Sequence, residues 1–168
     1  MQTLIVGLGN PILGDDGAGW RIAEEVASRL ELSAGDDPNF ATQDQQDKHS
    51  IHVECLSLGG LSLMEHLIGY NRAILIDTIL TGHQPIGTVH RFPLEDLPDL
   101  TTSHLSSTHD TSLQNALRVG QSMGVALPQE ITVVAVEARN VYDFSEELSQ
   151  PILEAVPTAV SIVMELLI

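Results

Sequence analysis

The stretch Thr3-Leu4-Ile5-Val6-Gly7-Leu8-Gly9-Asn10-Pro11-Ile12-Leu13-Gly14-Asp15-Asp16-Gly17-Ala18-Gly19 decides how this chain folds. Its aliphatic start, Thr3 to Val6, is typical of a buried strand, and the glycines that follow end this strand. Beyond the stretch, apolar residues recur at helical spacing: Ile22, Ala23, Val26 and Leu30. The pattern predicts a strand, a tight loop and a helix. Asp15 and Asp16 lie in that loop, and ligands of open α/β sheets bind at the loops that follow the strands.

The glycines of this loop do not complete a nucleotide-binding motif. The fingerprint G-x-G-x-x-G begins correctly at Gly7 and Gly9, but Ile12 stands at its last glycine position. No Gly-Lys-Ser/Thr sequence follows, so the phosphate-binding P-loop is excluded as well. Asp15 and Asp16 would also repel a phosphate at this place. A nucleotide site is therefore not expected here.

The charge of the chain argues against nucleic acid as a partner. The chain contains 7 Lys and Arg residues and 23 Asp and Glu residues, which gives a formal net charge of −16. Such a surface repels the phosphate backbone and gains nothing from counterion release. The acidic balance suits solubility, the steering of a basic peptide, or the concentration of cations near a metal site.

Length and composition indicate one globular domain that spans residues 1–168. The chain is long enough for a full hydrophobic core, and 43% of its residues are hydrophobic. No apolar run reaches transmembrane length, and the start lacks the basic region of a signal peptide. We therefore expect a cytoplasmic location and no membrane partner. The single cysteine, Cys55, cannot form an internal disulfide and is expected to be a small buried side chain.

Strand and helix patterns alternate along the rest of the chain. After a polar stretch at 33–50, interpreted as a surface loop, the patterns predict strands at 51–56, 72–77, 87–92 and 130–136. The aliphatic runs favour parallel central strands, whereas the short loop before 87–92 favours an antiparallel edge strand. The predicted fold class is α/β, a three-layer α/β/α sandwich with a mainly parallel twisted sheet and one antiparallel edge strand.

Helical spacing fills the intervals between these strands. Apolar residues recur in this way around Leu63 and Leu113 and in the last segment, from Ile152 to Leu167. The hydroxyl-rich sequence before Leu113 offers several possible caps for that helix, namely Ser107, Thr108 and Asp110.

Three sets of polar residues are candidates for chemistry at the carboxyl edge of this sheet. Asp15 and Asp16 follow the first strand, Asp77 ends the strand at 72–77, and His109 lies at a helix entrance. Two carboxylates and an imidazole suit a divalent cation such as nickel, zinc or cadmium, and three protein ligands leave coordination positions open.

Each of these residues also has a structural interpretation. Asp15 or Asp16 would serve equally well as the cap of the first helix. Asp77 would end its strand by accepting hydrogen bonds from loop amides, and His109 would be a satisfied histidine at a helix start. His104 competes with His109 as a ligand.

Five elements in the right order resemble the hydrogenase maturation proteases, the endopeptidases of nickel-iron hydrogenase assembly. They are Gly7-Leu8-Gly9-Asn10 with Asp15-Asp16-Gly17-Ala18-Gly19, Gly59-Gly60 with Met64 and Leu67, Ala73-Ile74-Leu75-Ile76-Asp77, Ser107-Thr108-His109-Asp110-Thr111-Ser112-Leu113, and Ile152 to Val160. The fourth element selects His109 over His104. One departure is Leu58, where some relatives carry an aspartate before the Gly-Gly pair.

The resemblance implies an endopeptidase that removes the C-terminal extension of a nickel-iron hydrogenase large-subunit precursor after nickel insertion. It implies that Asp16, Asp77 and His109 contact the substrate's nickel, and that no cofactor is held tightly by the protein itself. Their individual catalytic roles and the nucleophile stay unassigned. The resemblance gives a supporting role in the loops to Gly7, Gly9, Asn10, Asp15, Gly17, Gly19, Gly59 and Gly60.

The sequence leaves three alternatives to this function, of which the second is already disfavoured by the acidic charge and by a missing histidine. The first is a non-catalytic carrier of divalent metal that uses the same three residues. The second is a peptidyl-tRNA hydrolase, because the segment from Leu4 to Pro11 resembles the start of that family. The family continues with a catalytic histidine, whereas this chain has no histidine before His49. The third is a purely structural partner whose acids act as caps.

Overall fold

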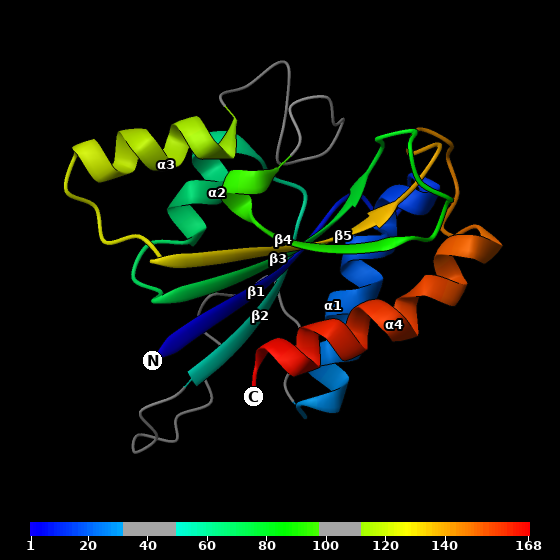
Figure 1. The fold of residues 1–168 in the computed structure, drawn as a ribbon, viewed down its shortest axis with the longest axis horizontal. Coiled ribbons are helices and arrows are strands. Elements are labelled where there is room, and N and C mark those ends of the chain that lie inside the picture. Colours follow the sequence, from blue (N-terminus) through cyan, green and yellow to red (C-terminus); the bar gives the residue numbers. More distant parts are fainter. Residues whose placement is uncertain (32–49, 98–111) are drawn as a thin grey trace.

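The computed structural model describes residues 1–31, 50–97 and 112–168, which form a five-stranded sheet with helices on both faces (Figure 1). The strands are β1 (Gln2–Leu8), β2 (Ser50–Leu56), β3 (Arg72–Ile79), β4 (Val89–Pro93) and β5 (Glu130–Glu137). The order across the sheet is β2-β1-β3-β5-β4. All neighbouring pairs are parallel except β4 with β5, which is antiparallel.

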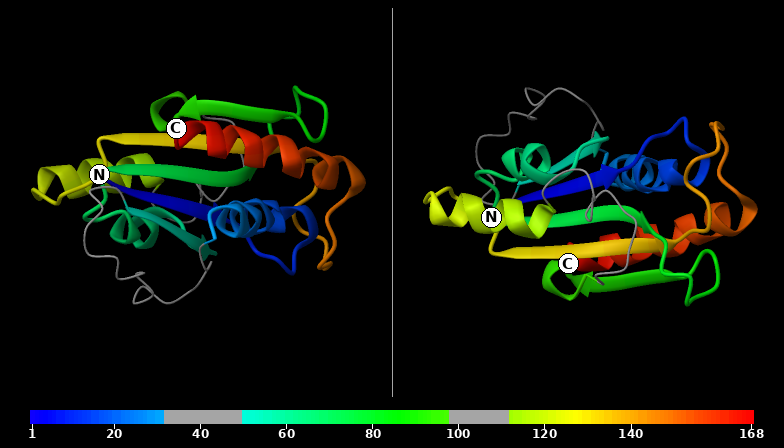
Figure 2. Two further views of the ribbon diagram at one scale, coloured as in Figure 1. Left: turned by 90° about the horizontal axis from the view of Figure 1, so that it is seen from below. Right: turned by 90° about the horizontal axis from the view of Figure 1, so that it is seen from above.

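The helices cover the sheet from two sides (Figures 1 and 2). Helices α1 (Ala18–Arg29) and α4 (Gln150–Leu166) lie on one face, and α2 (Gly60–His66) and α3 (Leu113–Ser122) lie on the other. Two short 3-10 turns, η1 (Gly14–Gly17) and η2 (Leu94–Asp96), complete the described elements. The predicted three-layer α/β/α sandwich, with a mainly parallel sheet and one antiparallel edge strand, is confirmed.

Alternation along the strands divides the core into two clusters. In β3, Ile74 and Ile76 pack against α1 and α4, whereas Leu75 and Ile79 pack against α2 and α3. Side chains of successive strand residues point to opposite faces, so a strand that is covered on both faces must be apolar at nearly every position. Cys55 is buried in the first cluster, as expected from the sequence.

β1 and β3 each extend two residues further at their carboxyl ends than the sequence patterns predict. β1 continues through Gly7 to Leu8, because its pairing with β2 persists to the end of both strands. β3 runs to Ile79, so the prediction that it ends at Asp77 is wrong. Pairing with β5 continues through Thr78 and Ile79, and this pairing holds the backbone extended beyond Asp77.

The cap of α3 also differs from the expectation. Ser112 is the N-cap, and its Oγ accepts a hydrogen bond from the backbone N–H of Asn115 at 3.3 Å. The expected caps Ser107, Thr108 and Asp110 precede this position and lie outside the described residues. The polar stretch at 33–50 also lies outside them, except for Ser50, which begins β2.

In the part of the chain that the structure describes, no helix has both the length and the apolar character needed to cross a membrane.

Candidate functional site

The loop after β1 folds into the 3-10 turn η1, which contains both Asp15 and Asp16. Helix α1 begins directly after it, with Gly17 as its N-cap and no capping hydrogen bond from a side chain. The interpretation of Asp15 or Asp16 as the cap of this helix is therefore wrong. Asp16 is instead buried, with 6% of its surface exposed, and its Oδ2 accepts a hydrogen bond from the backbone N–H of Asn10 at 2.8 Å.

Gly9 allows the turn to fold back onto the end of β1. Its φ of +134° is rarely accessible to other residues, and a Cβ at this position would lie 1.8 Å from the backbone oxygen of Asp16. The carbonyl of Gly9 accepts a hydrogen bond from Ser57 Oγ at 2.6 Å, which ties the turn to the segment before α2. The absence of a side chain at Gly9 thus determines where Asp16 lies.

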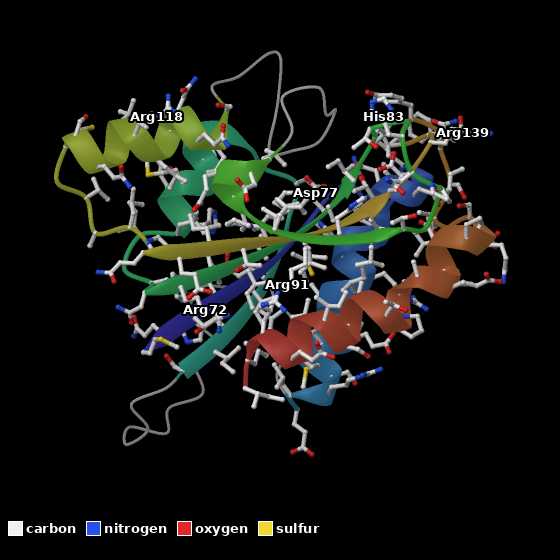
Figure 3. All side chains as sticks on the ribbon, in the orientation of Figure 1. Arg72, Asp77, His83, Arg91, Arg118 and Arg139 are labelled. Carbon is white, nitrogen blue, oxygen red and sulfur yellow. The ribbon has the colours of Figure 1, made fainter. Side chains whose placement is uncertain are left out.

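Asp77 reaches the same region from β3. Its side chain is 1% exposed, and its Oδ1 accepts a hydrogen bond from the N–H of Thr78 at 2.8 Å. Because it alternates with Leu75 and Ile79, Asp77 faces the side of the sheet that α2 and α3 cover (Figure 3). Thr78 belongs to β3 and not to a loop, so the interpretation of Asp77 as a residue that ends its strand by accepting hydrogen bonds from loop amides is wrong.

The packing of α1 brings the two carboxylates to one edge of the sheet. A Cβ at Gly19 would lie 2.1 Å from the oxygen of Leu8 and 2.6 Å from the oxygen of Ile76, the residue before Asp77. The start of α1 therefore lies directly over the ends of β1 and β3. Since those strands are parallel, Asp16 and Asp77 lie at the same carboxyl edge.

Asp15 connects η1 to the start of α4. Its Oδ1 accepts a hydrogen bond from the N–H of Ser149 at 2.7 Å, and its Oδ2 accepts one from Ser149 Oγ at 2.8 Å. Ser149 is the N-cap of α4. Asp15 thus joins two segments that are 134 residues apart in the sequence.

Asp15→Ala is expected to lower the free energy of unfolding by about 1–2 kcal/mol, because two charge-assisted hydrogen bonds at a partly exposed site are lost. Urea denaturation measures this change. Glu165→Ala, which removes an exposed carboxylate from α4, is the matched control and should change stability by less than about 0.5 kcal/mol. Equal stability of the two variants would contradict a bridging role for Asp15.

The third predicted ligand, His109, lies outside the described residues, as does its competitor His104. Within residues 1–31, 50–97 and 112–168, no group of three His, Cys, Asp or Glu side chains is arranged to hold a metal ion. The structure thus brings Asp16 and Asp77 to one edge, and the complete set with His109 stays a prediction.

A pocket of about 470 Å³ lies between η1, α1 and the segment before α4. Trp20 and Leu153 supply apolar walls, and the side-chain charges around the pocket are those of Arg21, Glu24, Glu146 and Glu147. The indole N–H of Trp20 donates to the carbonyl of Leu56 at 3.2 Å, which fixes the ring. The loop that carries Asp16 is therefore bordered by a concave surface of mixed polarity.

The sequence patterns did not single out Glu137, which is the last residue of β5 and is 1% exposed. Its Oε1 accepts hydrogen bonds from the N–H groups of Thr81 and Gly82, both at 2.9 Å, and from Thr81 Oγ1 at 3.0 Å. The signal was present in the sequence, because β5 ends in an acid at the same edge of the sheet as Asp77.

The fold and the site define an α/β protein with three buried carboxylates, those of Asp16, Asp77 and Glu137, at the carboxyl edge of a central, mainly parallel sheet. The sequence model described as "Hydrogenase maturation protease" matches residues 45–166. The chain therefore belongs to the hydrogenase maturation protease family, which confirms the resemblance found in its motifs.

Individual relatives match over most of the chain or nearly all of it. The hydrogenase expression/formation protein HupD of Rhizobium leguminosarum is 26% identical over 168 residues, which cover 99% of this chain and 74% of that protein. The hydrogenase 2 maturation protease of Escherichia coli is 28% identical and covers 81% of this chain and 73% of that protein.

Solved structures show the same fold. The hydrogenase maturating endopeptidase HybD of Escherichia coli superimposes with a TM-score of 0.70 at 20% identity, over 99% of this chain and 92% of that one. HybD of Thermococcus kodakarensis superimposes with a TM-score of 0.66 at 24% identity, over 99% of each chain.

Proposed function

We propose that this protein is a cytoplasmic endopeptidase that removes the C-terminal extension from the large-subunit precursor of a nickel-iron hydrogenase after nickel insertion. In this proposal Asp16, Asp77 and His109 engage the nickel that the substrate carries. The observation that supports it best is the placement of two buried carboxylates, from η1 and β3, at one edge of the sheet in a chain of this family.

Burial makes these carboxylates selective for a loaded precursor. Opposite charges attract each other more strongly where protein excludes water. A precursor that carries nickel offers a divalent cation to Asp16 and Asp77, whereas a nickel-free precursor offers none. This difference in binding free energy is what lets the protein distinguish the two forms of its substrate.

The carboxylates are also held in place before the substrate arrives. The backbone N–H of Asn10 fixes Asp16, and the N–H of Thr78 fixes Asp77. Ligands fixed in this way lose little conformational entropy on binding the metal. Nickel held between the two proteins would polarise the scissile carbonyl or activate a water molecule near it.

Cleavage is expected to depend on nickel in the substrate. A hydrogenase large-subunit precursor, incubated with this protein with and without prior nickel loading, should lose a short C-terminal peptide only in the loaded form. Mass spectrometry of the intact precursor measures the loss. The same precursor loaded in the absence of this protein is the control.

Two other outcomes would contradict the proposal. Equal cleavage of the loaded and nickel-free precursors would show a protease that does not sense nickel. Transfer of nickel to this protein, measured by metal analysis of the separated proteins, without any loss of precursor mass would indicate a metal carrier instead.

A further inference from the structure

We propose that His90, oriented by Glu137, is a proton-transfer residue of the proposed peptide hydrolysis. This inference rests on the proposed function and adds to it a group outside the set Asp16, Asp77 and His109. It rests on the register of three strands, on a carboxylate fixed by the loop after β3, and on a buried imidazole nitrogen that lacks a hydrogen bond.

The register of the sheet places His90 level with Asp77. Asp77 in β3 pairs with Ala135 in β5, and Ala135 pairs with His90 in β4. Residues that pair directly point to the same face, so all three lie on the face covered by α2 and α3. The neighbouring residue Phe92, two positions along β4, packs in the core cluster of that face.

Ala135 lies between Asp77 and His90 in this row and is itself buried, with 1% of its surface exposed. It carries only a methyl group, whereas a larger side chain in the middle strand would separate Asp77 from His90. Two strand spacings put the backbones of these residues roughly 10 Å apart, a distance that their side chains and a peptide group can span. A scissile peptide bound at Asp77 therefore lies within reach of His90.

Glu137 supplies a fixed carboxylate next to the imidazole. Three hydrogen bonds from Thr81 and Gly82 hold its Oε1, and Thr81 Oγ1 also lies 2.9 Å from its Oε2. His90 Nε2 lies 3.5 Å from that Oε2. A carboxylate held in this way orients an imidazole, the arrangement that positions histidines for proton transfer.

One nitrogen of the His90 imidazole lacks a hydrogen-bond partner among the residues that the structure describes. Within the described part of the chain, His90 Nε2 is buried and has no hydrogen-bond partner, an arrangement that costs free energy in a folded protein. An approach of about 0.5 Å would turn its 3.5 Å separation from Glu137 into a hydrogen bond. About a quarter of the side chain, 26%, is exposed, so the part of the ring other than Nε2 remains accessible to substrate.

His90 acts in both steps of the reaction, the attack by water and the departure of the leaving nitrogen. Its imidazole accepts a proton from water while the water oxygen bonds to the scissile carbonyl carbon. The imidazolium then gives this proton to the leaving nitrogen as the carbon–nitrogen bond breaks. The products are a carboxylic acid, which ionises, and an amine, and the imidazole is neutral again.

The test compares the rate of single-turnover cleavage of the nickel-loaded precursor by the wild-type protein, His90→Ala, Glu137→Gln and His83→Ala. His83 is an exposed histidine in the loop after β3, and its variant controls for loss of an imidazole (Figure 3). We expect His90→Ala to be about 100-fold slower, Glu137→Gln about 10-fold slower and His83→Ala unchanged. Co-purification with the uncleaved precursor should be the same for all four.

Chemical rescue separates proton transfer from a structural role. Free imidazole should restore at least a tenth of the rate lost in His90→Ala, because it can enter the space left by the missing side chain. A rate within threefold of the wild type, a parallel loss of precursor binding, or a lost rate that imidazole leaves unchanged would overturn the inference. A wild-type protein that leaves the loaded precursor uncut would overturn the proposed function as well.

Discussion

Asp77→Asn is expected to slow cleavage of the nickel-loaded precursor at least about 100-fold, since changes beyond the direct metal ligands alone cost about 10- to 100-fold. The substitution removes the charge that would bind nickel and keeps the shape of the side chain. An asparagine oxygen still accepts the hydrogen bond that Thr78 donates to Asp77 Oδ1. The fold should therefore survive, with a melting temperature within a few degrees of the wild type.

The rate is measured as loss of precursor mass over time in a single turnover. Glu130→Gln is the matched control, because Glu130 is an exposed acid at the amino end of β5, whereas Asp77 lies beside the carboxyl end of that strand. It should cleave within about twofold of the wild-type rate. If Asp77→Asn also cleaves within threefold of the wild type, Asp77 does not engage the nickel, and the proposed set of ligands is wrong.

Gly19→Ala is expected to lower the free energy of unfolding by about 3 kcal/mol or more, the upper range for overpacking a core. The new Cβ would lie 2.1 Å from the oxygen of Leu8 and 2.6 Å from that of Ile76. Both atoms belong to the backbone of central strands, so neither can move aside without disturbing the sheet. Helix α1 must shift away, although alanine is a better helix former than glycine.

Thermal and urea denaturation measure this loss, which corresponds to a fall of roughly 6–12 °C in melting temperature for a domain of this size. Ser28→Ala, at an exposed position of the same helix, is the control and should change stability by less than about 0.5 kcal/mol. A melting temperature of Gly19→Ala within 2 °C of the wild type would contradict the close packing of α1 on β1 and β3. Partial retention of fold with reduced cleavage would indicate that the shift also moves Asp16.

The sequence by itself determined the layers of the protein and the edge at which its acids gather. Aliphatic runs of strand length that alternate with helical patterns require a sheet covered on both faces, because only burial stabilises them. In such a sheet, the residues that follow parallel strands meet at one edge. Asp16 and Asp77 were therefore placed at one edge by local patterns alone.

Only the tertiary structure decided which side chains at this edge touch. The hydrogen bonds between Asp15 and Ser149 join residues that are 134 positions apart in the sequence. The row formed by Asp77, Ala135 and His90 depends on the register of three strands. Register and helix placement are set by the packing of the whole core, and a one-residue slip would send every side chain to the other face. The end of β3 at Ile79 has the same origin, because pairing with β5 carries the strand past Asp77.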